Sequence, residues 1–385
     1  MNVAEQIVAQ LVDAGVHRIY GIVGDSLNPI VDAVRKTGGS KKGGIDWIHV
    51  RHEEAAAFAA SAEAQLTGKL AVCAGSCGPG NLHLINGLYD ANRTGAPVLA
   101  IASHIPSVQI GSTYFQETHP DRIFEECSVY NELISSAAQS PRTVNSAIRH
   151  AVGLGGVSVI TLPGDVSDLK AVEHVPTYAP ARPATLAPNP ADIDEAAALL
   201  NKADKVAIFA GAGVEGAHDE VIALADALKA PIGHSLRGKH FIQYDNPFDV
   251  GMTGLLGYGA AAEGMNDADV LILLGTDFPY DQFLPDTPTI QVDTHAEKLG
   301  RRTDVGLAIH AQVKPFIEAL LPHLRAGRSD SFLKSKIKKH SEIMHAPVGA
   351  YTRNVEKMRP IHPEYAAHLL NETAAKDAIF TADTG

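Results

Sequence analysis

The sequence has few cysteines, a deficit of positive charge and no paired zinc-ligand pattern. Its three cysteines, Cys73, Cys77 and Cys127, are too few for a disulfide scaffold and suit a reducing compartment. Cys73 and Cys77 form a single C-x3-C pair, which argues against a zinc site. Lysine and arginine total 32 against 44 aspartates and glutamates, so the net charge is −12 and no nucleic-acid partner is expected.

Membrane and export signals are missing as well. No stretch reaches the roughly 18 apolar residues that a spanning helix needs. The N-terminus also lacks the basic start and apolar core of a secretory signal. The composition, 45% hydrophobic and 20% charged, is ordinary for a soluble globular protein. We therefore expect a cytoplasmic protein, and 385 residues predict two to three domains at roughly 150 residues each.

The sequence does contain a repeated alternation of short apolar runs and segments with helical periodicity. Continuous apolar strands that alternate with helices are typical of a parallel sheet covered on both faces. The predicted fold class is therefore α/β, with two doubly wound parallel-sheet domains, the second of them Rossmann-like. The expected strands include 18–22, 46–50, 70–74, 97–101, 157–161, 206–210, 270–274 and 289–292.

Shifts in composition predict the domain boundaries. The first expected linker is rich in proline and alanine, and the second is polar and weakly periodic. The last segment predicts a helix followed by a strand at 378–382. The expected division, in order, is a first domain at 1–168, a linker at 169–190, a central domain at 191–325, a second linker at 326–360 and the beginning of a third domain at 361–385.

Two candidate nucleotide contacts follow strands of the central domain. Residues 211–216 (GAGVEG) match G-x-G-x-x-G between a strand and a helix, the context of the dinucleotide fingerprint. The alternative is a glycine turn that only permits tight packing. Asp293 ends another strand, where it is placed to accept a hydrogen bond from a ribose or adenine, or else to cap a turn.

Three candidates lie in the first domain. Glu53 and Glu54 stand where a strand meets an alanine-rich helix, suited to proton transfer or simply to favouring the helix dipole. The turn at 75–81 (GSCGPGN) brings backbone close to a ligand, to a neighbouring subunit or only to packed neighbours. The loop at 111–119 presents aromatic side chains for ligand contact, or else uses them as anchors in the core.

Taken together, six motifs resemble the thiamine-diphosphate-dependent enzymes of the pyruvate oxidase and acetolactate synthase family. The longer matching stretches are most similar to its bacterial pyruvate:quinone oxidoreductase members. The resemblance covers essentially the whole chain, and its strength lies in the order and spacing of the motifs. They are residues 21–26 (GIVGDS), 51–54 (RHEE), 75–81 (GSCGPGN), 115–117 (FQE), 251–254 (GMTG) and 274–277 (LGTD).

The resemblance implies roles for particular residues. It makes Glu53 the acid that hydrogen-bonds the cofactor's pyrimidine and favours the imino tautomer that takes the thiazolium proton. It places Phe115 and Gln116 near the reacting carbon, between thiamine and flavin. The implied thiamine diphosphate contacts are Gly24, Gly78 and Asn81, and the implied FAD contacts are Gly211, Gly213, Gly251, Met252, Thr253, Gly254, Leu274, Gly275, Thr276, Asp277, Phe278 and Asp293.

The resemblance also implies a reaction and an assembly. The expected reaction is oxidative decarboxylation of pyruvate to acetate and CO2, with electrons passing through FAD to a quinone. Two alternatives stay open: a carboligase of the acetolactate synthase type and, for this chain alone, an inactive flavin-binding module. The family pattern implies a homo-oligomer, a dimer of dimers with active sites between chains.

One family motif is missing from the sequence. The metal and diphosphate motif, Gly-Asp-Gly followed by Asn-Asn, is absent, and neither 24–26 (GDS) nor 164–166 (GDV) replaces it. Only 25 residues follow position 360, so we expect a truncated product or a fragment of a longer chain. The Mg²⁺ ligands would then lie in the missing third domain, and so would the C-terminal tail by which the quinone-linked members dock peripherally on the inner face of the membrane. No metal ligand is assigned to these residues.

Overall fold

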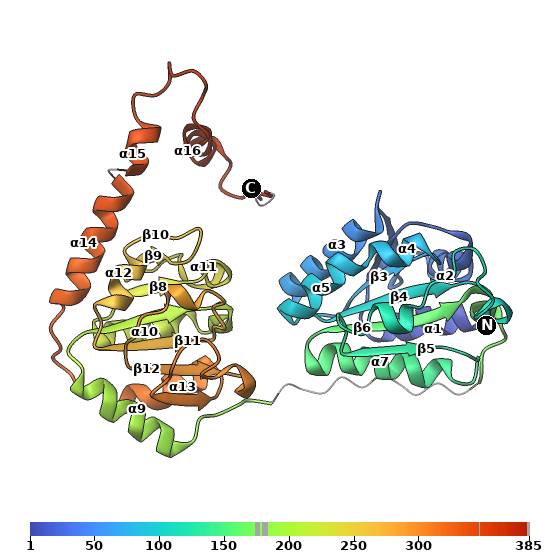
Figure 1. Ribbon diagram of the computed structural model, residues 1–385, viewed down its shortest axis with the longest axis horizontal. Helices are drawn as coiled ribbons and strands as arrows, with labels where there is room; N and C mark the ends of the chain where they lie inside the picture. The colour runs from blue at the N-terminus through green and yellow to red at the C-terminus, as the bar shows by residue number, and fades with distance from the viewer. Residues whose placement is uncertain (174–177, 179–183, 346, 383–385) are drawn as a thin grey trace. The chain divides into compact units, whose positions relative to one another are not determined.

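The chain divides into two compact units. A computed structural model describes residues 1–173, 178, 184–345 and 347–382, and the units are Met1–Arg182 and Pro183–Gly385 (Figure 1). Each unit holds a largely parallel sheet with helices packed on both of its faces. The predicted α/β fold class is confirmed. No helix in the described part of the chain is both long and apolar enough to cross a membrane.

The first unit is built on six parallel strands in the order β2-β1-β3-β4-β6-β5. The central strands β3, β4 and β6 are buried along their whole length, which explains their unbroken apolar runs. The strands are β1 (Arg18–Gly21), β2 (Asp46–His49), β3 (Ala71–Gly75), β4 (Val98–His104), β5 (Tyr130–Leu133) and β6 (Val157–Pro163).

Helices cover the first sheet with two separate apolar clusters. One cluster joins α1, α2 and α7 to the sheet, and the other joins α3 and α5. The alanines of α3 let α5 approach closely, because a Cβ on Gly87 would lie 2.5 Å from the Cβ of Ala57. The helices are α1 (Val3–Asp13), α2 (Asn28–Lys36), α3 (Glu53–Thr67), α4 (Pro79–His83), α5 (Ile85–Thr94), α6 (Pro120–Ile123), α7 (Ser140–Leu154) and α8 (Gly164–Asp168).

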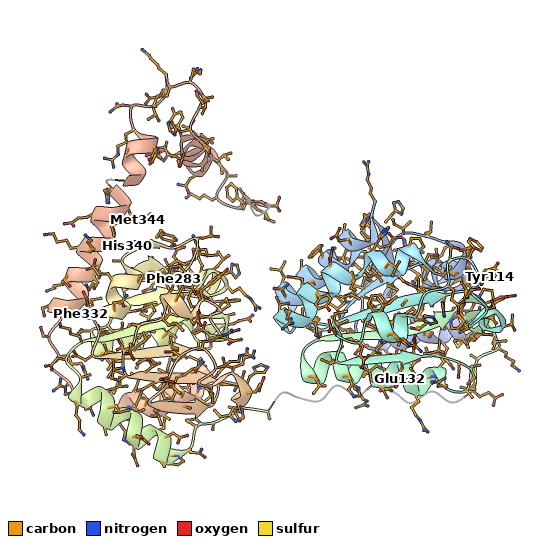
Figure 2. The ribbon with its side chains drawn as sticks, viewed as in Figure 1. Tyr114, Glu132, Phe283, Phe332, His340 and Met344 are labelled. Atoms are coloured by element: carbon orange, nitrogen blue, oxygen red, sulfur yellow. The ribbon has the colours of Figure 1, made fainter. Side chains whose placement is uncertain are left out.

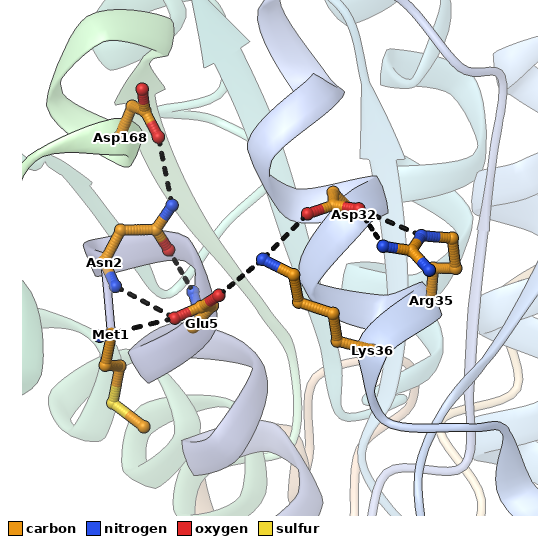
Figure 3. Close-up of polar contacts among 7 residues, drawn as sticks. All are labelled: Met1, Asn2, Glu5, Asp32, Arg35, Lys36 and Asp168. Carbon is orange, nitrogen blue, oxygen red and sulfur yellow. Dashed lines mark hydrogen bonds and ion pairs between the residues drawn. The ribbon is translucent and has the colours of Figure 1, made fainter.

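A polar network ties the start of α1 to α2 and α8 (Figure 3). Asn2 and Glu5 form a capping box, with the Glu5 N–H donating to Asn2 at 2.9 Å. The Asn2 amide donates to Asp168 at 3.0 Å. The Lys36 ammonium bridges Glu5 at 2.7 Å and Asp32 at 2.9 Å. The N-terminal helix is therefore held by its cap and its neighbours as well as by its apolar face.

The ends of the predicted linker at 169–190 are attached to the two units. The Val3 N–H donates to the Leu169 carbonyl at 2.9 Å, and the Gln6 amide donates to the Val172 carbonyl at 2.7 Å. At the other end, the Gln312 N–H donates to the Leu186 carbonyl at 2.9 Å. Most of the middle of the predicted linker lies outside the described residues. The described ends of the predicted linker are therefore held by the units that they adjoin.

The second unit has seven strands in the order β10-β9-β8-β7-β11-β12-β13. All pairs are parallel except β10 with β9, so this sheet is mixed. Without β10, the order is the 3-2-1-4-5-6 arrangement of dinucleotide-binding folds, with its reversal between β7 and β11. The strands are β7 (Val206–Ala210), β8 (Ile232–His234), β9 (Asp249–Met252), β10 (Tyr258–Gly259), β11 (Val270–Leu274), β12 (Thr289–Asp293) and β13 (Leu307–His310).

The helices that cover this sheet pack on more than one apolar cluster, and Met265 of α12 belongs to a smaller one with Phe209 and Leu271. The largest cluster lies elsewhere. That cluster includes buried side chains of α9, α10 and α13. The helices of the unit up to residue 320 are α9 (Pro190–Lys202), α10 (His218–Leu228), α11 (Leu236–Ile242), α12 (Ala261–Asn266) and α13 (Val313–Leu320).

The segment predicted as a second linker, 326–360, contains helices. They are α14 (Ser331–His345) and α15 (Pro347–Thr352), and Figure 2 shows Phe332, His340 and Met344 along α14. Phe332 is buried, and the Lys336 ammonium reaches Glu263 of α12 at 2.7 Å and Asp267, the residue that caps the end of α12, at 2.5 Å. Helix α14 therefore packs on the second unit, although its segment was predicted to be a linker.

The end of the chain matches the prediction only in part. The expected helix is present as α16 (Pro363–Thr373). The strand expected at 378–382 is not formed, and this prediction is wrong for these described residues. A strand is stabilised by hydrogen bonds to a neighbouring strand, and no described strand lies beside this segment.

Candidate active site

Loops of the first unit converge at the carboxyl edge of its sheet. The carboxyl ends of parallel strands share one edge, and ligands bind there where the strand order reverses. In this sheet the reversal lies between β1 and β3. The loops after these two strands touch: the Ser26 and Ser76 hydroxyls are 2.9 Å apart, and the Cys77 N–H donates to Ser26 at 3.0 Å. A Cβ on Gly24 would lie 2.6 Å from the Cβ of Ser76, so glycine permits this contact.

Glu53 is a buried carboxylate at this edge. It begins α3 directly after β2 and is 8% exposed. Its Oε2 lies 3.1 Å from Nδ1 of His83, the last residue of α4. Its Oε1 faces Gly80, where a Cβ would lie 3.2 Å away. Glu54 is directed elsewhere and accepts a hydrogen bond from Asn86 at 2.7 Å. The structure thus separates two acids whose position before the helix is equivalent, and it places at the edge Glu53, the one that the resemblance singles out.

The predicted glycine turn packs against the predicted polar loop. Gly78 has φ +72°, and a Cβ there would lie 2.8 Å from the Cβ of Gln116, so only glycine fits. The Cys77 thiol lies 3.7 Å from the Gln116 amide oxygen. Gln116 itself has φ +66°, a left-handed conformation that non-glycine residues rarely adopt. The turn and Gln116 are therefore brought together as neighbours.

The aromatic residues of the same loop are exposed. Phe115 is 69% exposed and Tyr114 is 39% exposed, with ring centroids 5.2 Å apart. Figure 2 labels Tyr114 at the margin of the first unit. The alternative that these side chains anchor the loop in the core is therefore wrong. Phe115 adjoins Gln116 in the chain, and its ring contacts that of Tyr114.

Asn81 is fully buried beneath the edge. Its amide donates to the Ser103 carbonyl at 2.5 Å and so ties α4 to β4. Its Oδ1 has no hydrogen-bond partner among the described residues, and the same holds for Nδ1 of the nearly buried His104. Burial lowers the pKa of His104, so its ring is neutral at pH 7. A buried carboxylate, small residues and unpartnered polar atoms fit the aminopyrimidine end of thiamine diphosphate.

His83 was missed at the sequence level. Its contact with Glu53 joins positions thirty residues apart and depends on the short helix α4 that follows the glycine turn. No spacing rule links such a pair. The only feature of the sequence that could have indicated His83 is its position just after the glycine turn at 75–81.

The predicted dinucleotide glycines of the second unit pack against each other's backbone. The Gly213 N–H donates to the Gly275 carbonyl at 2.9 Å, and a Cβ on Gly213 would lie 2.6 Å from the Gly275 Cα. Gly211 likewise donates to the Leu274 carbonyl at 2.8 Å. Gly211 precedes and Gly213 lies within the 3₁₀ turn Ala212–Val214, and α10 begins only at His218. The two glycines are packed as the tight-packing alternative describes, the expected direct entry into a helix is not observed, and their contact with FAD stays a prediction.

The acids and the ring predicted for FAD have partners within the unit. Asp277 forms ion pairs with Arg301 and Arg302. Asp293 accepts the His295 N–H at 2.9 Å, which is the capping alternative. Phe278 is buried, edge-on to Phe209 with ring centroids 5.2 Å apart.

The remaining predicted FAD positions lie at the same carboxyl edge. Thr276 follows β11 and its carbonyl accepts from Gln291 at 3.2 Å. Residues 251–254, including the buried Met252 and Thr253, end β9, and a Cβ on Gly254 would lie 3.2 Å from the Phe278 ring. The predicted residues are thus gathered at one edge, and Asp277, Asp293 and Phe278 already have side-chain partners there, so FAD contact at these positions stays a prediction. No group of three or more His, Cys, Asp or Glu residues in the described structure is placed to hold a metal ion.

Comparison with known proteins matches each unit to a domain of one family. Residues 1–123 match the thiamine pyrophosphate enzyme N-terminal TPP binding domain, and residues 193–320 match the thiamine pyrophosphate enzyme central domain. An uncharacterized 42.6 kDa protein of Pseudomonas amyloderamosa is 54% identical over 335 residues, covering 86% of this chain and 83% of that protein.

Named relatives are more distant and longer. The putative thiamine pyrophosphate-containing protein YdaP of Bacillus subtilis is 36% identical over 99% of this chain, and the pyruvate oxidase of Lactiplantibacillus plantarum is 30% identical over 96%. Several acetolactate synthases match at 28–31% identity. The chain spans 66% of the Bacillus subtilis protein and 62% of the pyruvate oxidase, less than two thirds of either. The chain belongs to the thiamine pyrophosphate enzyme family and carries its N-terminal and central domains.

Proposed function

We propose that this chain provides the pyrimidine-binding and central domains of an enzyme that decarboxylates pyruvate. The observation that supports this most is Glu53, a buried carboxylate at the carboxyl edge with one oxygen turned to a glycine turn. Bound thiamine diphosphate would supply the electron sink that accepts the electrons released with CO2.

The residues of this chain have separate tasks in the proposal. Glu53 holds and moves a proton at Oε1, and Gly80 leaves the room that this oxygen needs. Gly78 lets Gln116 approach the same turn. Thiamine diphosphate contacts at Gly24 and Asn81 remain proposals.

The full proposal is oxidative decarboxylation to acetate, with electrons passed through FAD to a quinone. Its support is the sequence resemblance to the quinone-linked enzymes and the 30% identity to a protein named pyruvate oxidase. It includes Mg²⁺ held by a third domain, a homo-oligomer with sites between chains, and a cytoplasmic enzyme that contacts the membrane surface.

A carboligase of the acetolactate synthase type is the second candidate. Its support is the group of acetolactate synthases at 28–31% identity, close to the identity of the pyruvate oxidase. A flavin-binding module without turnover is the third candidate for the chain on its own, since the Gly-Asp-Gly motif is absent from it.

Product analysis separates these candidates. The protein expressed from its complete gene is purified, its visible spectrum is recorded, and it is incubated with pyruvate, thiamine diphosphate, Mg²⁺ and a soluble quinone. Acetate, CO2 and quinol support the oxidase, whereas acetolactate supports the carboligase. A flavin band without any pyruvate turnover supports the binding module and contradicts both enzymes.

A further inference from the structure

Two stacked imidazole rings lie beside Glu53 and have no place in the function proposed above. His83 closes α4, and His52 immediately precedes α3. Their ring centroids are 4.3 Å apart with an interplanar angle of 27°. His83 points its Nδ1 at Glu53 Oε2, 3.1 Å away.

His52 is fixed by the backbone. Its Nδ1 accepts the Glu54 N–H at 3.2 Å and so caps α3. An accepting Nδ1 carries no proton, which puts the proton of the neutral ring on Nε2. The Glu54 carboxylate lies 3.8 Å from the same Nδ1 and is also tied to Asn86. The stack therefore rests on a ring that belongs to the helix cap.

The contact with Glu53 determines which nitrogen of His83 carries a proton. A carboxyl oxygen without a proton only accepts hydrogen bonds, so with Oε1 as the oxygen that exchanges the proton, Oε2 accepts and Nδ1 of His83 is the donor. His83 is then either the neutral Nδ1–H tautomer or the imidazolium. Its side chain is 44% exposed, whereas that of Glu53 is 10% exposed, so solvent reaches the histidine far more than the carboxylate.

These contacts leave the carboxylate with one available oxygen. Oε2 is taken by His83, and Oε1 faces Gly80 at the turn. A hydrogen bond on one oxygen fixes the rotation of the carboxylate plane, and the stack on His52 limits the swing of the donor ring. Catalytic groups act well only when their orientation is held in advance in this way.

We propose that His83 is the positioning residue of Glu53: its Nδ1–H holds Oε2 so that Oε1 is presented to the aminopyrimidine of the cofactor, and His52 supports the ring. This rests on the proposed function only for the identity of the ligand. The hydrogen bond and its direction are properties of the chain itself and can be tested without cofactor or turnover.

The first test is ¹⁵N NMR of the full chain with ¹⁵N-labelled histidine, at neutral pH and without cofactor. We expect a protonated Nδ1 on His83, and we expect its signal to move when Glu53→Gln replaces the carboxylate. His218, whose Nδ1 lies 3.1 Å from Asp219 in the other unit, is the internal control and should not move. A bare Nδ1 on His83, or a signal indifferent to Glu53→Gln, overturns the proposal.

The second test measures the affinity for thiamine diphosphate of the protein expressed from its complete gene, with histidine variants as matched controls. His83→Ala should weaken binding about tenfold or more, the range expected for a hydrogen bond to a charged group. His83→Asn keeps a neutral donor near the position of Nδ1 and should restore binding to within about threefold, whereas His83→Leu should not.

The two tests separate this inference from the proposed function. Equal affinity in His83→Ala and in the unmodified protein overturns the positioning role. If the unmodified protein binds no thiamine diphosphate, the proposed function fails, and the NMR result alone decides whether His83 orients Glu53.

Discussion

The two sheets of this protein both end in glycine-rich loops, but the glycines do different work. In the first unit, Gly78 and Gly80 lie against side chains: a Cβ on them would meet Gln116 and Glu53. In the second unit, a Cβ on Gly213 or Gly275 would meet the backbone of the other glycine's loop. In the first unit Gly80 leaves room for the Glu53 carboxylate and Gly78 leaves room for Gln116, whereas in the second unit the glycines allow two loops to pack against each other.

This difference shows why a glycine motif alone is weak support for a ligand site. Both sets follow parallel strands, and the second lies at the strand-order reversal of its sheet, where ligands commonly bind. The carboxylates near the second set, Asp277 and Asp293, have partners inside the unit. Glu53 instead keeps one oxygen free of hydrogen bonds within the described structure. We therefore expect substitutions at the carboxyl edge of the first unit's sheet to affect function, and substitutions at the carboxyl edge of the second unit's sheet to affect stability.

The largest effect is expected at Glu53. Glu53→Gln should lower pyruvate decarboxylation by about 10²- to 10⁴-fold, because the amide cannot exchange a proton with the pyrimidine. Release of CO2 by the protein expressed from its complete gene is the measurement. Glu54→Gln, in the same helical turn but directed to Asn86, is the control and should stay within about threefold of the unmodified rate. Full activity in Glu53→Gln would sink the assignment.

The second effect, on the free energy of unfolding, concerns the two loops of the second unit that carry Gly213 and Gly275. Gly275 has φ +57° and its Cβ would collide with Gly213, so Gly275→Ala should lower the free energy of unfolding by about 3 kcal/mol. Gly216→Ala, with φ +70° and open space around it, isolates the backbone contribution and should cost about 1 kcal/mol.

Urea unfolding followed by two probes locates this effect. The single tryptophan, Trp47, lies in β2 and reports the first unit, whereas far-UV circular dichroism reports both units. Gly275→Ala should move the dichroism transition and leave the Trp47 fluorescence transition in place. If Gly275→Ala and Gly216→Ala lower the free energy of unfolding equally, the close contact between the loops that carry Gly213 and Gly275 is contradicted.

Much of the fold followed from the sequence because it depends on burial. Strands such as β4 and β11 are buried along their whole length, so their apolar runs were visible without any structure. Helix α14 was not visible, because its anchor is partly polar: Lys336 sits between two carboxylates of another helix. Periodicity detects apolar faces, and it does not detect a lysine that becomes buried by its partners.

The candidate site was predictable to the same partial degree. Glu53 and Glu54 stood out because carboxylates precede an alanine-rich helix, and only the family resemblance singled out Glu53. Its partner did not, since the contact with His83 depends on how the turn before α4 folds back. The sequence left Asp293 with two interpretations: the structure shows the cap, because the carboxylate accepts a backbone N–H, and the nucleotide contact stays a prediction. A single sequence does not show which residues become neighbours in the folded protein.

The third effect tests the polar anchor of α14. Lys336→Ala should lower the local opening free energy of α14 by about 2 kcal/mol, because it removes a buried ammonium from Glu263 and Asp267. Hydrogen exchange of α14 peptides by mass spectrometry is the measurement. The control is Lys338→Ala, whose side chain is 79% exposed and 3.8 Å from Glu342, and it should leave exchange nearly unchanged.

The same anchor has a defined pH dependence. Burial by itself lowers the pKa of Lys336, but hydrogen bonds to Asp267 and Glu263 outweigh it and raise the pKa above the ordinary lysine value. A raised pKa on a cation means that its contribution is complete below the ordinary value and is lost as the pH rises through the folded value. Protection of α14 should therefore hold through neutral pH and decline only above pH ~10.5. A decline that begins near neutrality would contradict the ion-pair anchor.

The smallest effect is expected at Gly80 in the first unit, and it tests the difference between the glycines of the two units most directly. A Cβ on Gly80 would lie 3.2 Å from Glu53 Oε1, slightly too close, and the flexible carboxylate rather than the backbone would give way. Gly80→Ala should change the free energy of unfolding by less than about 1 kcal/mol, because alanine is also the better helix former in α4. The displaced oxygen should weaken thiamine diphosphate binding about threefold to tenfold. Gly153→Ala, a glycine of α7 with open space around it, is the matched control and should leave the affinity unchanged. The contrary result is that Gly80→Ala lowers the free energy of unfolding as much as Gly275→Ala does and leaves the affinity for thiamine diphosphate unchanged. That result would show that the glycines of both units serve packing alone, and it would contradict the assignment of the site to the first unit.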